Sequence, residues 1–283
     1  MSNKLYFNSL GYSGRLGNQM FQFASAFAIS SNNGLELKIP FQNTRTPKMV
    51  KLTNSQIVEY KLELFDCFDL PKNFLINESE IKIKNTKREL NFGYSHDFLS
   101  LRPNTNIDGY FQDYRYFLNF RHQITELFNF NEKVRSLANQ EYEEIQKFYG
   151  QSEVFNMVAV HIRRGDYLTG DGRHYSVDVT KYLALLNEVV KNKKIVIFSD
   201  DINYINSIVK FQDCYKVDIG NHFAEMCLMS MFKNLIISNS TFSWWAAYLS
   251  VNPQNIFIPK PWFGPKLNHF DTTGLYVENW KTF

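Results

Sequence analysis

The stretch Met157-Val158-Ala159-Val160, followed by His161-Ile162-Arg163-Arg164-Gly165-Asp166, decides the fold class of this chain. Four consecutive apolar residues that lead into charged residues and a glycine are typical of a buried strand reaching the edge of a sheet. Arginine side chains bind phosphate oxygens through both charge and planar geometry. An open α/β sheet presents such groups to a phosphorylated ligand at the ends of its strands. The stretch therefore predicts an α/β fold that binds a phosphorylated molecule.

The chain from residue 157 onward alternates apolar strands with helices. We expect strands at 157–162, 195–198, 235–238 and 256–258, and helices at 179–190, 202–209, 223–231 and from about 240. This alternation predicts a parallel, doubly wound sheet. Polar groups follow three of the strands: Arg163 with Arg164, Asp200 with Asp201, and residues 239–241. Because parallel strands end at the same edge of a sheet, we expect these groups to converge on one crevice.

The N-terminal half is less regular. A strand at 4–9, a glycine-rich turn at 11–18 and helical spacing from Met20 form a β–turn–α unit without the GxGxxG spacing of dinucleotide sites. Residues 40–110 are punctuated by prolines and read as irregular, whereas 111–148 looks mostly helical. We expect a linker at 150–152, and hence domains at 1–150 and 151–283.

Composition excludes several classes of protein. The 283 residues contain 31 basic and 28 acidic side chains, a net charge of +3, which disfavours a nucleic-acid binder. No apolar run is long enough to cross a membrane, and the N-terminus does not read as a signal peptide. Three cysteines without metal spacing indicate a reducing cytoplasm. The basic residues of 82–88 indicate a solvated face, or peripheral contact with an anionic membrane at its inner face.

The charged groups after the first strand have two interpretations. Arg163 and Arg164 form ordinary salt bridges, or they clamp a diphosphate, because adjacent guanidinium groups repel each other without an anion. Successive residues of an extended chain point to opposite faces, so we expect Arg163 to meet the phosphates and Arg164 to brace the loop. His161 is a buried histidine bonded to a carbonyl, or it contacts the base or ribose of a nucleotide.

The segment from Asn239 to Trp245 joins a strand to a helix. Ser240 or Thr241 caps that helix, and the same free N–H groups and helix dipole favour an anion, so the two readings are compatible. Trp244 and Trp245 are expected to pack in the core. Glu225 lies on an apolar helical face; it faces water near the helix start, or it accepts the paired N–H donors of guanine.

Two further polar sites leave alternatives open. Asp200 and Asp201 are consecutive rather than in a D-x-D pattern, so a turn cap or a ribose contact is favoured over a metal site. In the turn 14–21, Asn18 is a plain helix cap or a functional amide beside glycines that permit close backbone approach.

Four stretches together resemble the inverting α-1,2-fucosyltransferases, glycosyltransferase family 11. They are Gly14-Arg15-Leu16-Gly17-Asn18-Gln19-Met20-Phe21, His161-Ile162-Arg163-Arg164-Gly165-Asp166-Tyr167, Phe198-Ser199-Asp200-Asp201 and Ser238-Asn239-Ser240-Thr241-Phe242-Ser243-Trp244-Trp245. The order of the stretches is that of the family. The 40–110 segment carries no such motif.

The resemblance implies an α/β fold of GT-B type, with two Rossmann-like domains facing a cleft: an acceptor-side domain at 1–150 and a donor-binding domain at 151–283. It implies GDP-fucose as the donor, a galactose-containing acceptor and no metal or other cofactor. By the same resemblance, Arg163 and Asn18 are catalytic, with Arg163 on the diphosphate and Asn18 near the fucose and acceptor. The expected donor contacts are His161, Arg164, Asp200, Glu225, Asn239, Ser240, Thr241 and Phe242, with Glu225 reading guanine.

The reaction itself calls for a proton acceptor. The acceptor hydroxyl attacks fucose C1 from the face opposite GDP, and Asp166 and Asp171 are the candidate bases. Asp166 alternatively holds the arginine loop together. Two other hypotheses remain open: a non-catalytic module that binds nucleotide or glycan, and a fucosyltransferase with a different acceptor.

Overall fold

Two compact units make up the protein. The computed structural model describes the chain except for residues 1–2, 42–47, 52–56, 170–171 and 190–192. Unit 1 comprises residues 1–52, 56–129 and 270–277, and unit 2 comprises residues 53–55, 130–269 and 278–283. Each unit contains a parallel β-sheet with helices, so the expected α/β class is confirmed. The assignment of the acceptor to the first half and the donor to the second stays a prediction.

The main sheet of unit 1 is parallel. Its strand order is β5-β2-β1-β7-β6. The strands are β1 Lys4–Tyr6, β2 Glu36–Pro40, β5 Leu75–Ile76, β6 Asn85–Arg88 and β7 Thr105–Asp108. From β1 the chain adds β2 and β5 on one side of β1, and then β6 and β7 on its other side. The strand order therefore reverses between β1 and β7.

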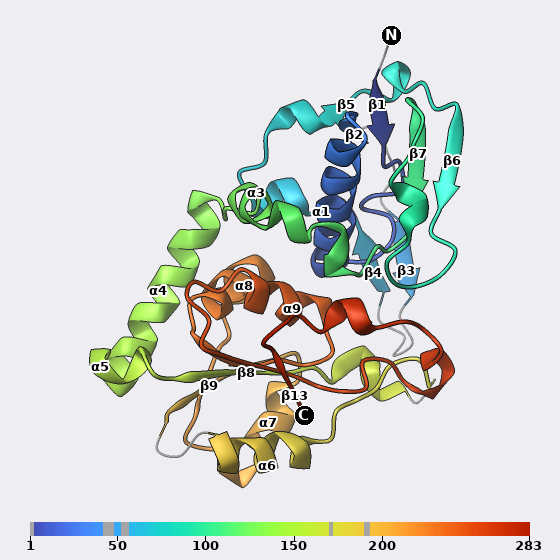
Figure 1. Ribbon diagram of the computed structural model, residues 1–283. Helices are drawn as coiled ribbons and strands as arrows, with labels where there is room; N and C mark the ends of the chain where they lie inside the picture. The colour runs from blue at the N-terminus through green and yellow to red at the C-terminus, as the bar shows by residue number, and fades with distance from the viewer. Residues whose placement is uncertain (1–2, 42–47, 52–56, 170–171, 190–192) are drawn as a thin grey trace. The chain divides into compact units, whose positions relative to one another are not determined.

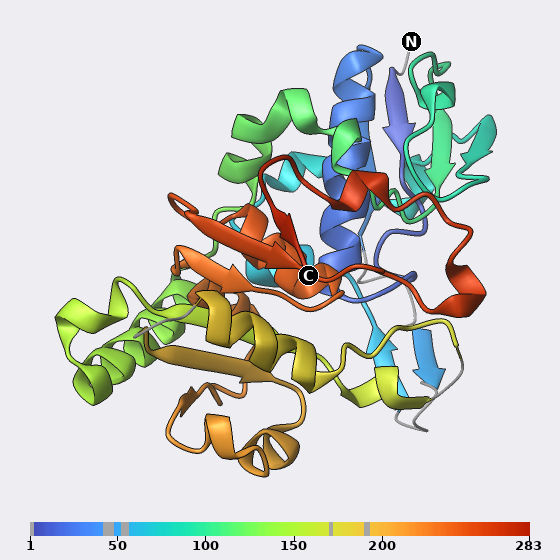
Figure 2. The same ribbon diagram turned by 60° about the horizontal axis from the view of Figure 1, so that its bottom comes forward.

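Helix α1, Leu16–Asn32, forms the core of unit 1 with this sheet. Met20, Phe23 and Ala24 recur at helical spacing and are fully buried. Figures 1 and 2 show the helix alongside the strands of the sheet in both views. The helix ends at Asn32, before Gly34, as the sequence predicts.

The expectation that residues 40–110 are irregular is wrong in part. This region contributes β5, β6 and β7 to the sheet, and β3 Lys48–Lys51 pairs with β4 Ile57–Tyr60 in an antiparallel hairpin. These strands are only two to four residues long, and β3 and β6 are mostly exposed. Such strands carry little hydrophobic periodicity. The short helix α2, Leu64–Cys67, follows the hairpin.

Unit 2 contains the doubly wound sheet expected from the sequence. Its strand order is β10-β9-β8-β11-β12-β13, and all neighbours are parallel. The strands are β8 Val158–Ile162, β9 Ile195–Ser199, β10 Tyr215–Lys216, β11 Asn234–Ile236, β12 Asn255–Ile258 and β13 Lys281–Thr282. The chain first adds β9 and β10 on one side of β8 and then β11, β12 and β13 on the other. The order reverses between β8 and β11.

Helices cover both faces of the unit 2 sheet. They are α4 Glu132–Tyr149, α6 Val179–Val189, α7 Ile202–Asn206, α8 His222–Ser230 and α9 Thr241–Tyr248. Figure 1 shows α8 and α9 on one side of β8 and α6 and α7 on the other. Val158, Val160 and Ile162 of β8 pack with Tyr182 and Leu186 of α6 in one core cluster. Burial on both faces explains the unbroken apolar runs of these strands.

The segment between the two regular regions is more ordered than a linker. Within 111–148 the structure places α3, Arg121–Leu127, and α4, which confirms the helical expectation. Gly150 adopts a φ of 90°, and α5, Gln151–Val154, follows it directly. The expected linker at 150–152 is therefore wrong, because these residues connect two helices within unit 2.

Candidate active site

The predicted polar groups gather at one edge of the unit 2 sheet. Strands β9, β8 and β11 are neighbours, and all three run in the same direction. Their carboxyl ends lead into the polar residues 200–201, 163–166 and 238–241 respectively. Open α/β sheets bind ligands outside the carboxyl ends of strands, at the point where the strand order reverses. Residues 163–166 and 238–241 flank that point, between β8 and β11.

Arg163 lies between two aspartates. Its Nη2 is 2.6 Å from Oδ1 of Asp166, and its Nη1 is 3.0 Å from Oδ2 of Asp200. The side chain is only 16% exposed. Burial works to lower the pKa of Arg163, but the charges of Asp200 and Asp166 outweigh burial and raise it. The structure thus supplies anions from within the chain, and adjacent arginines here do not require an external one.

Arg164 takes a different set of partners. Its Nε is 3.2 Å from Oδ2 of Asp201, and its guanidinium carbon lies 3.2 Å from the ring centroid of Tyr204. Its backbone N–H donates to Asp200, so Asp200 joins both arginines. Asp201 also caps α7 by accepting from the N–H of Tyr204. These contacts match the bracing role expected for Arg164 and the turn cap expected for Asp201.

Gly165 explains why the arginine turn is so tight. A Cβ atom at this position would collide with the Asp200 carboxylate. The glycine lets the turn after β8 approach the end of β9, and the short 3-10 segment Gly165–Thr169 follows. Asp166, in that segment, accepts from Nε and Nη2 of Arg163. This geometry matches the alternative in which Asp166 holds the arginine loop together.

His161 is a buried, neutral histidine. Its Nδ1 lies 2.8 Å from the hydroxyl of Ser238, across the β8–β11 boundary. Burial, and then the charge of Arg163, lower its pKa to about 3. The partner is a hydroxyl rather than the carbonyl expected for a core histidine. The ring of Phe242 lies beside it at a centroid distance of 5.8 Å.

The Asn239–Thr241 segment begins α9. The Asn239 amide donates to the carbonyls of Tyr175 and Trp262, at 2.6 and 2.8 Å. Ser240 occupies the N-cap position, as predicted, but its hydroxyl makes no capping bond within the described part of the chain. The N–H groups of the first turn of α9 are therefore not engaged by that hydroxyl. Asn239 organises the surrounding loops, whereas Ser240 presents the helix start.

The tryptophans behind this helix start belong to the core. Trp244 and Trp245 are fully buried, with ring centroids 5.1 Å apart in an edge-on arrangement. The expectation that they pack rather than bind a sugar is confirmed. Trp244 also packs against Tyr248 and Trp280, and these contacts hold α9, and with it Ser240, in place.

Glu225 lies in the first turn of α8, where Asn221 caps the helix. Burial raises the pKa of Glu225, and this effect exceeds the opposing effect of His222. In the described part of the chain no hydrogen bond or salt bridge engages this carboxylate, although His222 is near enough to lower its pKa. A partly buried carboxylate without a donor is suited to a ligand that brings N–H groups.

Asn18 lies in unit 1, in the first turn of α1. Arg15, not Asn18, occupies the N-cap position, so the plain-cap alternative for Asn18 is wrong. The Asn18 Oδ1 accepts from Nε2 of Gln112 at 3.1 Å. Its neighbour Gln19 is fully buried and donates to the carbonyls of Gly14 and Lys61. Gln19 is structural, whereas Asn18 remains a candidate for contact with substrate.

The remaining predictions concern Asp171, a metal site, a membrane span and the basic segment 82–88. Asp171, the second candidate base, lies outside the described residues. No three His, Cys, Asp or Glu side chains of the described ranges are grouped as a metal site. In the part of the chain that the structure covers, no helix has the length and apolar character needed to span a bilayer. Lys87 and Arg88 of the basic segment pair with Asp97 and Asp108, which offset part of its positive charge.

Three residues that received no role from the sequence also shape the site. Tyr167 donates from its hydroxyl to the carbonyl of Asn239 and stacks on His174. Tyr204 supports Arg164, and Ser238 holds His161. Tyr204 follows Asp201 by only three residues, whereas the Ser238–His161 contact spans 77 residues and gave no local signal.

Comparison with known proteins gives the site its context. Residues 1–282 match the description "Glycosyl transferase family 11". The chain belongs to this family. Its membership confirms the resemblance carried by the four motifs and identifies the protein as a glycosyltransferase.

Relatives within family 11 come from distant organisms. An α-1,2-colitosyltransferase of Escherichia coli is 32% identical, with 91% of this chain and 93% of the relative covered. Galactoside α-(1,2)-fucosyltransferase 2 of Pongo pygmaeus is 24% identical, with 94% and 76% covered. The solved α-1,6-fucosyltransferase NodZ aligns with a TM-score of 0.50 at 12% identity, covering 90% of this chain and 94% of NodZ. This last likeness concerns the fold, and it agrees with the expected GT-B type.

Proposed function

We propose that this family 11 member transfers fucose from GDP-fucose to the 2-hydroxyl of a galactose-containing glycan, with inversion at the anomeric carbon. The observation that carries the proposal is the position of Arg163 and the start of α9 on either side of the β8–β11 reversal. A diphosphate at that point receives a guanidinium from one strand end and N–H groups from the other. The GDP co-crystallised with NodZ, a protein of similar fold, supports the choice of nucleotide.

The chemistry follows from charge. The acceptor oxygen forms a bond to fucose C1 as the C1–O bond to the diphosphate breaks, and the bonding electrons leave with GDP. Negative charge therefore grows on the diphosphate, where Arg163 and the α9 start stabilise it. Removing one such donor typically raises the activation free energy by about 3 kcal/mol. These fixed groups supply the neutralisation that a divalent ion would otherwise supply, so we propose that the reaction needs no metal.

The remaining donor contacts have distinct roles in this proposal. Glu225 accepts N1–H and N2–H of guanine, because its carboxylate is partly buried and otherwise lacks a donor. Ser240 and Thr241 lie against the phosphates at the start of α9, and Phe242 packs beside His161. His161 remains neutral and contributes position rather than charge. Asp200 and Arg164 hold the arginine turn against β9.

The acceptor proton needs a base, and Asp166 is the described candidate. Oδ1 of Asp166 already accepts two N–H groups from Arg163. We therefore assign Asp166 mainly to the positioning of Arg163, and we propose that Asp171, the other candidate base, takes the proton of the acceptor hydroxyl. Asn18 is proposed to orient the fucose or the acceptor hydroxyl.

A second donor is favoured by one observation. The 32% identical relative is named as a colitosyltransferase, and colitose is fucose without the 3-hydroxyl. GDP-colitose would leave the phosphate and guanine contacts unchanged. The two donors therefore differ only in contacts to the sugar ring.

The test incubates the protein with GDP-fucose or GDP-colitose and a lactose-type acceptor, with EDTA present. Transfer of fucose to the galactose 2-hydroxyl in EDTA supports the proposal. Faster transfer of colitose assigns the second donor, and product linked elsewhere assigns a different acceptor site. GDP binding without product from either donor refutes transfer to this acceptor and favours a binding module.

A further inference from the structure

Unit 1 has its own reversal of strand order, between β1 and β7. The carboxyl ends of these two strands are joined by hydrogen bonds. The Ser9 hydroxyl donates to Asp108 at 2.7 Å, and the N–H of Asn8 donates to Asn106 at 2.8 Å. By the rule applied to unit 2, a ligand of unit 1 binds outside these strand ends. The segment directly after β7 is the turn 109–113.

This turn is held by a buried carboxylate. Oε2 of Glu89, directly after β6, accepts the N–H of Tyr110 at 2.7 Å and of Phe111 at 3.0 Å. A Cβ atom on Gly109 would collide with Glu89, so the glycine allows this approach. Phe111 has a φ of 50° and is fully buried. A bulky residue in the left-handed region is strained, and such strain is concentrated at ligand sites.

Helix α1 holds the same turn from the other side. Gln22 donates to the carbonyl of Gly109 at 3.0 Å, and Ser25 donates to the carbonyl of Phe111 at 3.1 Å. Gln112 donates to Asn18, the residue already assigned to the sugar or acceptor. The backbone of the turn is therefore fixed by Glu89, directly after β6, and by side chains of α1.

What this rigid turn presents is an aromatic ring. Tyr110 remains 44% exposed, although its own N–H and the carbonyl of Gly109 are both hydrogen-bonded. Partial burial, then Tyr60, then Glu89 raise the pKa of Tyr110, so Tyr60 of β4 lies close to it. Leu90, beyond Glu89, is 81% exposed. An exposed ring on a rigid backbone loses little entropy when it binds a partner.

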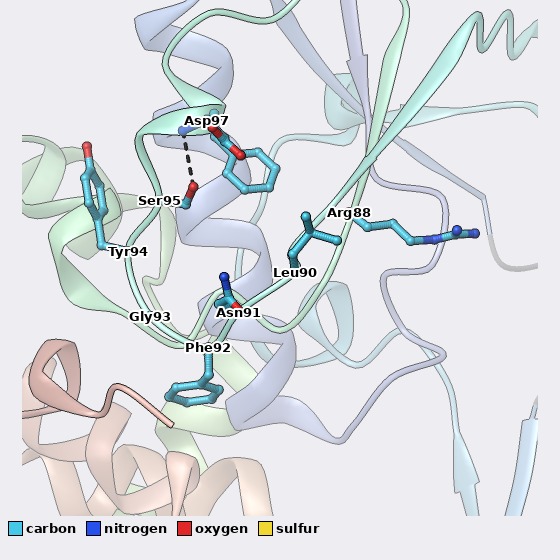
Figure 3. A pocket seen from close by; sticks show the side chains of 9 residues that line it. Arg88, Leu90, Asn91, Phe92, Gly93, Tyr94, Ser95 and Asp97 are labelled. Carbon is cyan, nitrogen blue, oxygen red and sulfur yellow. Dashed lines mark hydrogen bonds between the residues drawn. The ribbon is translucent and has the colours of Figure 1, made fainter. Parts of the chain in front are cut away.

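A cavity of about 150 Å³ lies along the loop after β6. Phe98, which lines it, packs against Phe111 of the turn with ring centroids 5.0 Å apart. Arg88 and Leu90, on either side of Glu89, belong to its lining, together with Asn91, Ser95 and Asp97. Figure 3 shows Arg88, Leu90 and Phe92 leaving the loop in different directions, with the Asp97 N–H bonded to the Ser95 hydroxyl. Pockets for drug-sized ligands are roughly 300–1,000 Å³, so this space suits a single sugar ring.

We propose that the turn 109–113 and this cavity form the acceptor subsite, with the Tyr110 ring packed against the C–H face of a galactose-type pyranose. Galactose carries three hydrogens on one face of its ring, and that apolar face complements a tyrosine ring with a polar hydroxyl at its edge. The polar cavity lining then faces the sugar hydroxyls. Glu89 is a positioning residue, because it acts through the backbone of Tyr110. The subsite rests on the proposed transfer to a galactoside.

The experiment measures galactoside binding directly, by saturation-transfer NMR with lactose and methyl β-galactoside. Wild type, Tyr110→Ala and Tyr110→Phe are compared, and Phe148→Ala is the control because Phe148 is an exposed aromatic of unit 2. We expect about tenfold weaker binding for Tyr110→Ala and near-normal binding for Tyr110→Phe and the control. Equal binding by wild type and Tyr110→Ala, or no binding by wild type, overturns the subsite.

Glu89 is tested by separating KM for the two substrates. Glu89→Ala removes the acceptor of both N–H groups, so KM for the acceptor rises while KM for the donor is unchanged. Glu89→Gln retains a carbonyl oxygen and restores the acceptor KM. Equal rises in both KM values, or no rescue by glutamine, refute the positioning role. If galactosides bind through Tyr110 but no sugar is transferred, the proposed function fails and the subsite stands.

Discussion

The charge of Glu89 gives a stability prediction that the structure quantifies. Burial, opposed by the Phe111 and Tyr110 N–H groups and aided by Asp113, raises the pKa of Glu89 from 4.5 to about 7. Folded Glu89 therefore holds a proton more tightly than unfolded glutamate. Its stabilising contribution is complete below pH 4.5 and is lost as pH rises to about 7. The shift corresponds to about 3 kcal/mol, since each pKa unit is worth about 1.4 kcal/mol.

The perturbation is Glu89→Gln, which keeps an oxygen for the two N–H groups but cannot ionise. The free energy of unfolding of wild type minus that of the variant should fall by about 3 kcal/mol between pH 4.5 and pH 8. Glu59→Gln is the control, because Glu59 is an exposed glutamate of β4 in the same unit. Its difference from wild type should stay flat over the same range.

The assay is urea unfolding followed by far-ultraviolet circular dichroism at a series of pH values. All four tryptophans, at positions 244, 245, 262 and 280, belong to unit 2. Tryptophan fluorescence therefore reports on unit 2, and circular dichroism is needed to include unit 1. A Glu89→Gln difference that changes by less than about 1 kcal/mol, or that rises with pH, would refute the burial argument.

Three variants test the remaining assignments. Arg163→Ala should lower the rate of transfer at least about a hundredfold and weaken GDP binding. It should also lower the free energy of unfolding by about 3 kcal/mol, because two aspartates lose their cation. Retained activity in a folded variant would remove the diphosphate assignment. Glu225→Ala should reduce the preference for GDP over other nucleoside diphosphates in a calorimetric comparison, and an unchanged preference would contradict guanine recognition. Asn18→Ala should lower kcat more than GDP affinity, while the reverse pattern would assign Asn18 to the nucleotide.

The regular part of the fold could be predicted because its signals are local. Strands such as β8 and β9 are buried on both faces, so each is an unbroken apolar run with a polar end. The short strands of unit 1 have no such run, and β6 reads as four polar residues. Their pairing depends on neighbours distant in the sequence.

The sequence was enough to locate the site, but not to predict which of its residues contact one another. The strand ends placed Arg163, Asp200 and Ser240 at one edge correctly. The contacts between them span long separations, 36 residues for Arg164 to Asp200, and no local pattern encodes them. The Glu89–Tyr110 turn was missed for the same reason, because the strain of Phe111 and the burial of Glu89 exist only after folding.

The two aspartates that pair with Arg163 also have a consequence for the anions that bind there. Any incoming anion must compete with two resident carboxylates for the same guanidinium, so a free orthophosphate or chloride ion gains little from it. In the proposed function a nucleoside diphosphate gains further contacts at the α9 start and Glu225, and we expect these contacts to favour it over small anions. We also expect the two carboxylates to compete with a bound diphosphate for Arg163 and so to speed its release.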